Sequence, residues 1–200
     1  MKQEILNILK TELGIHHSKV INIYLFGSRC YNNFNEDSDY DITIVLDTDS
    51  SDTEYTFFDY NFHLVTSTSF ENKLQYNDPR IIECLLYNPK ILENKKYTLS
   101  ITPKKFRHSV SHTSSNSWVK AKKKIEQNDI YIGQKSLYHS LRIPMFATQI
   151  MEHNDIIDWE CANSYWYIIK SIDNWDTLSD TFKPIKNEIM SKFRILCPKF

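Results

Sequence analysis

Apolar residues follow two different periods along the chain, and the change between them separates a strand-rich front from a helical back. Residues 2–13 carry apolar side chains on one helical face, and Gly14 follows as a C-cap. Short runs rich in β-branched and aromatic residues occupy 20–26 and 41–46, and both predict buried strands. A third strand is expected at 57–66, which reads FFDYNFHLVT.

From about residue 103 the helical period dominates. Before residue 103, short helical segments are predicted at 70–76 and 80–87. After residue 103, Pro144 is expected to kink or interrupt one of the helices. Strands followed by helices indicate an α+β domain at 1–102 and a helical domain at 103–200. The later helices are expected near 104–127, 134–151, 160–171 and 180–195.

Composition places the chain among folded globular proteins, because 41% of its 200 residues are hydrophobic and 24% are charged. The four cysteines form no C-x-x-C pair, and the N-terminus lacks the apolar core of a signal peptide. No run approaches the roughly 18 apolar residues of a membrane-spanning helix. We therefore expect a cytoplasmic protein with no membrane partner.

The segment LFGSRCYNNFNEDSDYDITIV carries the candidate chemistry. Its Gly27 and Ser28 end a buried strand, where the backbone can approach a ligand closely and the amides and hydroxyl can bind phosphate oxygens. Asp39 and Asp41 are two apart in an extended segment, so both side chains project to the same side. Two adjacent carboxylates favour a hard divalent cation such as Mg²⁺, although D-x-D at a strand start also occurs in ordinary loops.

A Gly-Ser pair followed about a dozen residues later by Asp-x-Asp resembles the signature of the polymerase-beta superfamily of nucleotidyltransferases. In detail the segment resembles the minimal nucleotidyltransferase branch. The resemblance covers about residues 20–92, and it implies a mixed β-sheet flanked by helices, an NTP substrate and Mg²⁺ or Mn²⁺. By that resemblance the nucleotide-binding residues are Gly27, Ser28 and Arg29, and the metal-binding and catalytic residues are Asp39 and Asp41.

The family's third acidic residue stands directly before a hydrophobic pair on a later strand, and here that position is His63. A neutral imidazole is a weaker match to Mg²⁺, but it can assist proton transfer. A half-buried strand histidine with a satisfied hydrogen bond is the other interpretation. Asp59 has the same strand parity and is the alternative metal ligand, provided that the strand runs deeper or bulges there.

Charge divides along the chain: residues 1–100 hold 9 Lys and Arg against 15 Asp and Glu, whereas residues 101–200 hold 15 against 10. Four lysines crowd beside Trp118 and can hold a polyanion such as RNA, although a solvated helix face has the same pattern. These lysines are Lys120, Lys122, Lys123 and Lys124.

Lys135, His139 and Arg142 fall at i, i+4 and i+7, so they share one face of a predicted helix. The pattern resembles the helix that follows the catalytic domain in the RNA-repair-associated branch of the superfamily, which occurs in bacteria and their phages. That resemblance implies that the stripe binds a nucleotide triphosphate or an acceptor phosphate. An ordinary amphipathic helix is the other interpretation.

Two functional hypotheses follow. The first is an enzyme that uses two metal ions to transfer a nucleotidyl group from an NTP to a hydroxyl acceptor, most simply an RNA end, with release of pyrophosphate. The second is a catalytically impaired nucleotidyltransferase-like domain that binds nucleotide or RNA and acts as an interaction protein, such as a phage effector or a toxin–antitoxin component. The intact Gly-Ser and Asp-x-Asp favour the first hypothesis, and His63 favours the second.

Overall fold

The structure is a computed structural model that describes residues 1–36 and 38–198. It divides into two units, Met1–Ser100 and Ile101–Phe200. The first unit holds a five-stranded sheet with flanking helices and the second is helical, which confirms the predicted α+β class with a helical C-terminal region. The boundary of independent domains at 102/103 stays a prediction. Among the described residues, no helix is both long and apolar enough to cross a membrane.

The first unit is built on a mixed sheet of strand order β3-β4-β2-β1-β5. β2 pairs antiparallel with β1 and parallel with β4, so it lies at the centre of the sheet. The strands are β1 (Val20–Phe26), β2 (Tyr40–Leu46), β3 (Thr53–Phe57), β4 (Tyr60–Thr66) and β5 (Leu92–Glu93).

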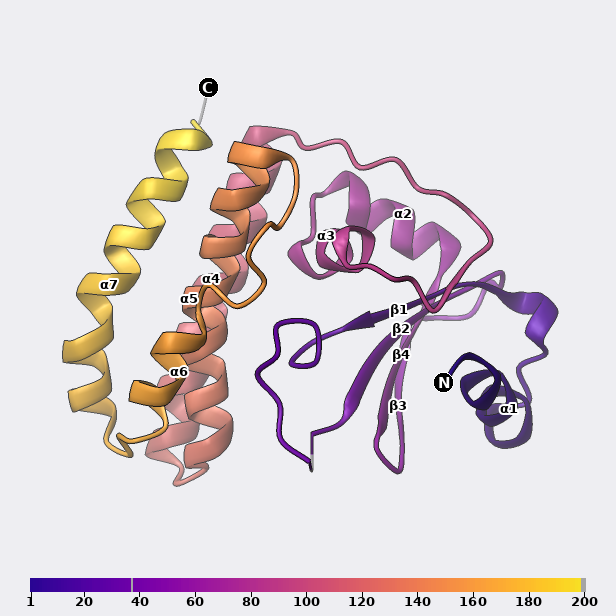
Figure 1. Ribbon diagram of the computed structural model, residues 1–200, viewed down its shortest axis with the longest axis horizontal. Coiled ribbons are helices and arrows are strands. Elements are labelled where there is room, and N and C mark those ends of the chain that lie inside the picture. Colours follow the sequence, from indigo (N-terminus) through magenta and orange to yellow (C-terminus); the bar gives the residue numbers. More distant parts are fainter. Residues whose placement is uncertain (37, 199–200) are drawn as a thin grey trace. The chain divides into compact units, whose positions relative to one another are not determined.

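Helices cover both faces of this sheet (Figure 1). α1 (Lys2–Leu13) packs on the face that carries Ile42, whereas α2 (Ser67–Gln75) and α3 (Pro79–Leu86) cover the face that carries Val45. Successive residues of β2 therefore alternate between two apolar cores. At the start of β2, Asp41 has the same parity as Val45, so its side chain lies on the sheet face that α2 and α3 cover.

The prediction of a single strand over 57–66 is wrong, because a tight turn at Phe58 and Asp59 divides the segment into β3 and β4. Phe58 has a left-handed backbone with φ 47°, a conformation that an aromatic residue does not signal in the sequence. β3 begins at Thr53, four residues before the start of the predicted strand.

The other elements expected in this unit are present within a few residues. The helix at 2–13 ends at Gly14, which caps it with φ 66° and donates its backbone N–H to the Leu9 carbonyl. The strand at 20–26 is as predicted, and the strand at 41–46 begins one residue earlier.

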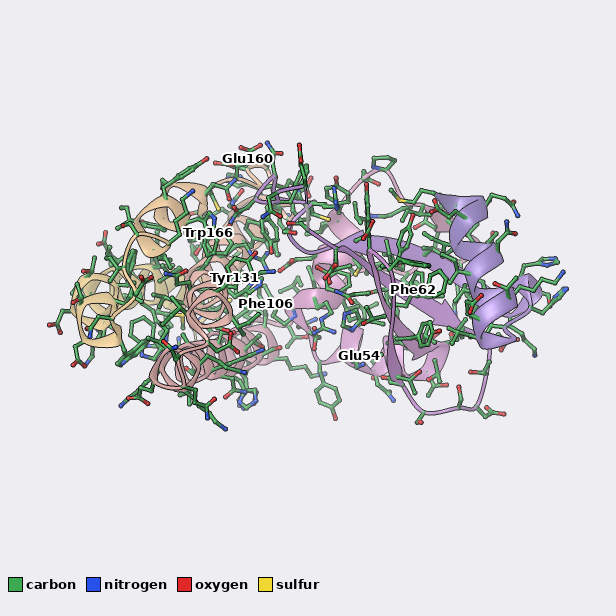
Figure 2. All side chains as sticks on the ribbon, turned by 90° about the horizontal axis from the view of Figure 1, so that it is seen from below. Glu54, Phe62, Phe106, Tyr131, Glu160 and Trp166 are labelled. Carbon is green, nitrogen blue, oxygen red and sulfur yellow. The ribbon has the colours of Figure 1, made fainter. Side chains whose placement is uncertain are left out.

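Four helices form the second unit in the part of the chain that the structure describes. α4 packs against α5, and α5 packs against both α6 and α7. Figure 2 labels Phe106 of α4, which meets Phe193 edge to face, and Tyr131 of α5, which meets Trp166 in the same way. The helices are α4 (Pro103–Glu126), α5 (Ile130–His153), α6 (Asn163–Ile169) and α7 (Trp175–Leu196).

Pro144 lies inside α5 and does not end the helix, contrary to an expected interruption. Proline has no N–H, so the carbonyl of Ser140, four residues earlier, loses its helical donor. The Ser114 hydroxyl of α4 donates to that carbonyl at 2.7 Å, and both serines are fully buried. A hydrogen bond from the neighbouring helix thus replaces the one that proline removes.

Candidate active site

The Gly-Ser turn and the two aspartates meet where β1 ends and β2 begins. Phe26, the last residue of β1, is paired with Asp41 in the antiparallel register, so their side chains leave the same face of the sheet. Asp39 lies two residues before Asp41 and shares that face through the strand period. This is the face that α2 and α3 cover further along the sheet.

Gly27 touches the Asp41 carboxylate. Its φ of 81° lies in the left-handed region, and a Cβ atom at this position would stand 2.2 Å from Asp41 Oδ2. Any other side chain would therefore displace the carboxylate and strain the backbone. Glycine is required here because the turn and the aspartate occupy the same small space.

Arg29 fastens the loop that separates the two motifs. Its Nη2 donates to the Ser38 carbonyl at 2.5 Å, and its Nε donates to the Asp39 carbonyl at 3.3 Å. Its guanidinium also lies 3.7 Å from the centre of the Tyr40 ring. These contacts make Arg29 a residue that positions Asp39, and the predicted contact of Arg29 with nucleotide stays a prediction.

Asn61 of β4 holds the Asp39 carboxylate, a role that no local pattern in the sequence predicts. Its Nδ2 donates to Asp39 Oδ2 at 2.9 Å, while its Oδ1 accepts from the Thr56 hydroxyl of β3 at 2.9 Å. The parallel register pairs Asn61 with Asp41. Hydrogen bonds thus run from Thr56 of β3 through Asn61 of β4 to the carboxylate of Asp39, just before β2, and hold it in place.

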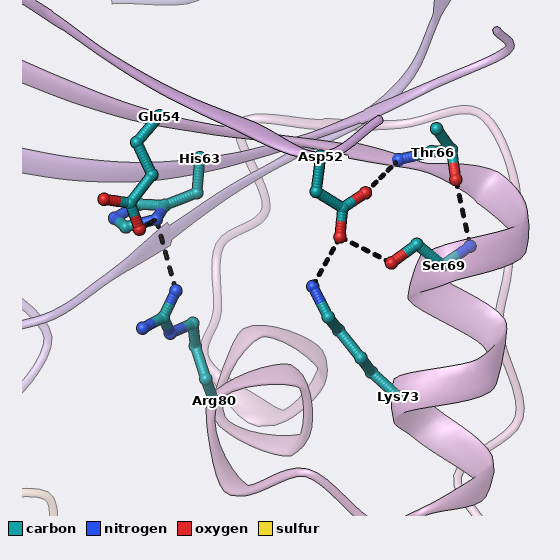
Figure 3. A network of polar contacts seen from close by, with 7 residues as sticks. All are labelled: Asp52, Glu54, His63, Thr66, Ser69, Lys73 and Arg80. Carbon is teal, nitrogen blue, oxygen red and sulfur yellow. Dashed lines mark hydrogen bonds and ion pairs between the residues drawn. The ribbon is translucent and has the colours of Figure 1, made fainter. Parts of the chain in front are cut away.

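His63 lies one step further along the same face and is held by charged side chains from two elements (Figure 3). Its Nδ1 lies 2.9 Å from Glu54 Oε1 of β3 and 3.2 Å from Arg80 Nη1 of α3. The ring also meets Phe26 edge to face at 5.0 Å. The antiparallel register pairs Glu54 of β3 with His63 of β4, so a carboxylate lies beside the imidazole.

Burial lowers the pKa of His63 below its ordinary value of 6.5, and the positive charge of Arg80 lowers it further. The charge and hydrogen bond of Glu54 act in the opposite direction but do not restore the pKa. The imidazole is thus neutral at neutral pH. In a neutral ring Nδ1 either donates to Glu54 or accepts from Arg80, and in the tautomer that donates to Glu54 the other nitrogen, Nε2, is a proton acceptor.

Asp59 occupies the turn before β4 and is exposed. Its carbonyl accepts the Tyr40 amide at 2.6 Å, which ties this turn to the start of β2. Among the described residues, no three His, Cys, Asp or Glu side chains are grouped so as to hold a metal ion. The predicted role of Asp59 as a third ligand stays a prediction.

The donor set present at the site fits a cation that takes part of its coordination from substrate. Mg²⁺ is commonly held by one or two carboxylates plus phosphate oxygens and water. Asp39 and Asp41 supply two hard oxygen ligands on one face, and the Gly27 turn lies directly against one of them. These two residues would hold Mg²⁺ or Mn²⁺.

A second network beside the site anchors the chain after β2 (Figure 3). The Asp52 carboxylate accepts from the Thr66 amide at 3.1 Å, the Ser69 hydroxyl at 2.5 Å and Lys73 Nζ at 2.7 Å. Burial alone would raise the pKa of Asp52, but these hydrogen bonds and the Lys73 charge outweigh it and lower the pKa. The network joins the β2–β3 connection to the first turn of α2.

The predicted cationic stripe of the helical unit lies on α5. His139 Nδ1 is 3.3 Å from Arg142 Nη2, and Lys135 Nζ stands 5.3 Å from the centre of the Tyr131 ring. Arg142 is only 4% exposed, with its guanidinium 4.7 Å from the Phe146 ring centre. Arg142 is therefore a packed residue of this unit, and nucleotide binding by the stripe stays a prediction.

Comparison with known proteins adds an independent line of evidence. Residues 3–96 match the family model described as "Polymerase beta, Nucleotidyltransferase". A solved nucleotidyltransferase-like protein from Exiguobacterium sibiricum 255-15 matches at 12% identity, over 98% of this chain and 74% of that chain, with a TM-score of 0.36, a likeness that carries no inference. No curated protein matches the chain. The segment 3–96, with its Gly-Ser turn and paired aspartates, belongs to the polymerase-beta superfamily of nucleotidyltransferases.

Proposed function

We propose that the protein transfers a nucleotidyl group from a nucleoside triphosphate to a hydroxyl acceptor, with an RNA end as the acceptor. The acceptor oxygen forms a bond to the α-phosphorus, the bond from that phosphorus to the β-phosphate bridging oxygen breaks, and pyrophosphate leaves. The observation that carries this proposal is the placement of Asp39 and Asp41 on one sheet face with the Gly27 turn against Asp41.

The Gly27 turn is suited to hold the triphosphate. Successive backbone amides after a left-handed glycine form a concave donor surface for phosphate oxygens. The Ser28 hydroxyl adds a donor next to that surface. When bound by Asp39 and Asp41, two divalent ions would stabilise the charge that develops on the attacking and leaving oxygens.

His63 is proposed to receive the proton of the acceptor hydroxyl. A base near neutral pH suits this task, and an imidazole with a lowered pKa is unprotonated there. Glu54 is assigned as the positioning residue on the premise that Nδ1–H donates to Glu54 and that Nδ1 does not accept from Arg80, since only this tautomer leaves Nε2 to accept a proton. In this proposal His63 of β4 and Glu54 of β3 together take the part of the family's third carboxylate in accepting the proton.

Pyrophosphate release tests the proposal. The full chain is incubated with each NTP, Mg²⁺ or Mn²⁺, and an RNA mixture, and pyrophosphate is followed with a coupled assay. Asp39→Asn/Asp41→Asn should reduce release at least about 100-fold, since it removes both proposed metal ligands. Asp47→Asn/Asp49→Asn is the control, because this second D-x-D is exposed and lies beyond the far end of β2. Equal rates for the two variants would refute the enzymatic proposal.

A second candidate function is the impaired nucleotidyltransferase-like domain that binds nucleotide or RNA without turnover. It is favoured by the engagement of His63 with Arg80 and Glu54, which gives the position a complete set of structural contacts. In that case NTP binding, measured by calorimetry with Mg²⁺, would depend on Asp41 while no pyrophosphate is released. Measurable pyrophosphate release with wild type would exclude this candidate.

A further inference from the structure

α4 carries a row of polar and cationic side chains, most of them exposed. The residues recur every four positions, so neighbours in the row lie close together, but each step also turns about 40° around the helix axis, and the last residue, Lys124, is only partly exposed. Over its length α4 carries seven Lys and Arg residues and one acidic residue, Glu126. The row consists of His108, His112, Asn116, Lys120 and Lys124.

The lysine end of this row is hollowed. Lys123 and Gln127 flank the row there, and Val119 beside them is 65% exposed. Lys124 is bound to Asp129 at 2.8 Å, and the neighbouring Lys122 lies 3.7 Å from Glu126. The hollow is lined by Asn116, Val119, Lys120, Lys123, Lys124 and Gln127.

Lys120 and Lys123 differ from these paired lysines. Neither lysine has an ion-pair partner in the part of the chain that the structure describes. The two lie three residues apart in α4. Two exposed ammonium groups one helical turn apart repel each other, and they are stabilised by an anion with closely spaced charges. The phosphates of a nucleic-acid strand have that character.

The other end of the row offers flat rings. His108 and His112 are stacked with centroids 6.2 Å apart and planes at 5°, and His112 Nε2 lies 2.9 Å from Asn116 Nδ2. Exposed ring faces bind unpaired bases by stacking, without preference for sequence. A membrane surface would instead need a broad apolar face, and Val119 is the one large exposed apolar residue among those named on this face.

We propose that the exposed surface of α4 and its C-cap, from His108 to Gln127, binds single-stranded RNA, with phosphates at Lys120 and Lys123 and bases against the two histidines. At a rise of about 1.5 Å per residue, the face extends roughly 28 Å, enough for several nucleotides. The inference deepens the proposed function by naming the surface that holds the RNA acceptor, but it depends on binding and not on transfer.

Fluorescence anisotropy with a labelled 20-nucleotide RNA of mixed sequence, without NTP or divalent metal, tests the surface. Lys120→Glu/Lys123→Glu should weaken binding at least about tenfold and flatten the slope of log affinity against log salt by about 1.4, the value for two single-strand phosphate contacts. Lys183→Glu/Lys192→Glu changes charge equally on exposed positions of α7 and should change affinity less than about threefold. Lys120→Gln/Lys123→Gln should weaken RNA binding by an amount between the losses of the two charge-reversal variants.

Circular dichroism establishes that each variant is folded. The proposal is overturned if wild type does not bind the RNA, if both charge-reversal variants weaken binding equally, or if duplex RNA or anionic lipid vesicles bind more tightly than the single strand. Because no NTP is present, loss of transfer activity with intact RNA binding would contradict the proposed function alone. Transfer to an acceptor without RNA binding would contradict this inference alone.

Discussion

The contact between Gly27 and Asp41 is the residue-scale feature on which the site depends. Gly27→Ala should lower pyrophosphate release at least about tenfold, because the methyl group displaces a proposed metal ligand, and it should destabilise the fold by about 1–3 kcal/mol through backbone strain. Gly14→Ala is the matched control: its φ is 66°, but no atom lies within 4 Å of the added Cβ. Gly14→Ala should lower the free energy of unfolding without lowering pyrophosphate release. Equal pyrophosphate release by Gly14→Ala and Gly27→Ala would contradict the contact between Gly27 and Asp41.

His63 provides a second residue-scale prediction. Glu54→Gln should lower the pKa of His63 further, because the carboxylate raises it, whereas Arg80→Gln should raise that pKa. Proton NMR titration of the imidazole measures both changes. Shifts in the same direction would disprove the assigned contacts.

The same histidine links stability to pH. Its folded-state pKa lies below 6.5, so the unfolded chain takes up a proton first as pH falls. The free energy of unfolding of wild type should therefore decrease below about pH 6.5 more than that of His63→Gln. Urea unfolding at several pH values checks this expectation, and parallel pH profiles for the two proteins would count against it.

At the scale of elements, α4 and α5 are joined by a buried hydrogen bond from the Ser114 hydroxyl to the Ser140 carbonyl. Ser114→Ala removes the donor to the Ser140 carbonyl, which Pro144 already deprives of its helical partner, so unfolding should become easier by about 1–3 kcal/mol. Thr113→Ala is the control, because its hydroxyl bonds to the Ser109 carbonyl within an unbroken stretch of the same helix. Chemical denaturation measures the free energy of unfolding of both variants. Similar decreases would contradict the role of Ser114 in replacing the hydrogen bond that Pro144 removes.

Elements with strong periodicity could be predicted from the sequence, and those set by partners could not. The strands at 20–26 and 41–46 have the composition of buried strands, and both are present. The division of 57–66 was missed because its turn contains Phe58, whose side chain matches a strand pattern. Pro144 was expected to disrupt its helix because the rescuing Ser114 lies 30 positions earlier in the chain.

At the scale of the molecule, spacing along the chain identified the Gly-Ser turn and both aspartates, and the family match to residues 3–96 confirms that recognition. Asn61 and Glu54 were not singled out, because their role depends on strand register: β4 brings one to Asp39, and β3 brings the other to His63. Register follows from tertiary packing and is not encoded in local pattern.

The central claim is that this site transfers the α-phosphorus of an NTP. The most direct measurement compares NTPs labelled with ³²P at the α or γ position in reactions with the acceptor RNA and Mg²⁺ or Mn²⁺. The α-label should appear on the acceptor, the γ-label should be released in pyrophosphate, and Asp39→Asn/Asp41→Asn should abolish both. Transfer of γ-label, absence of α-label from the acceptor, or unchanged transfer by the variant would contradict nucleotidyl transfer at this site.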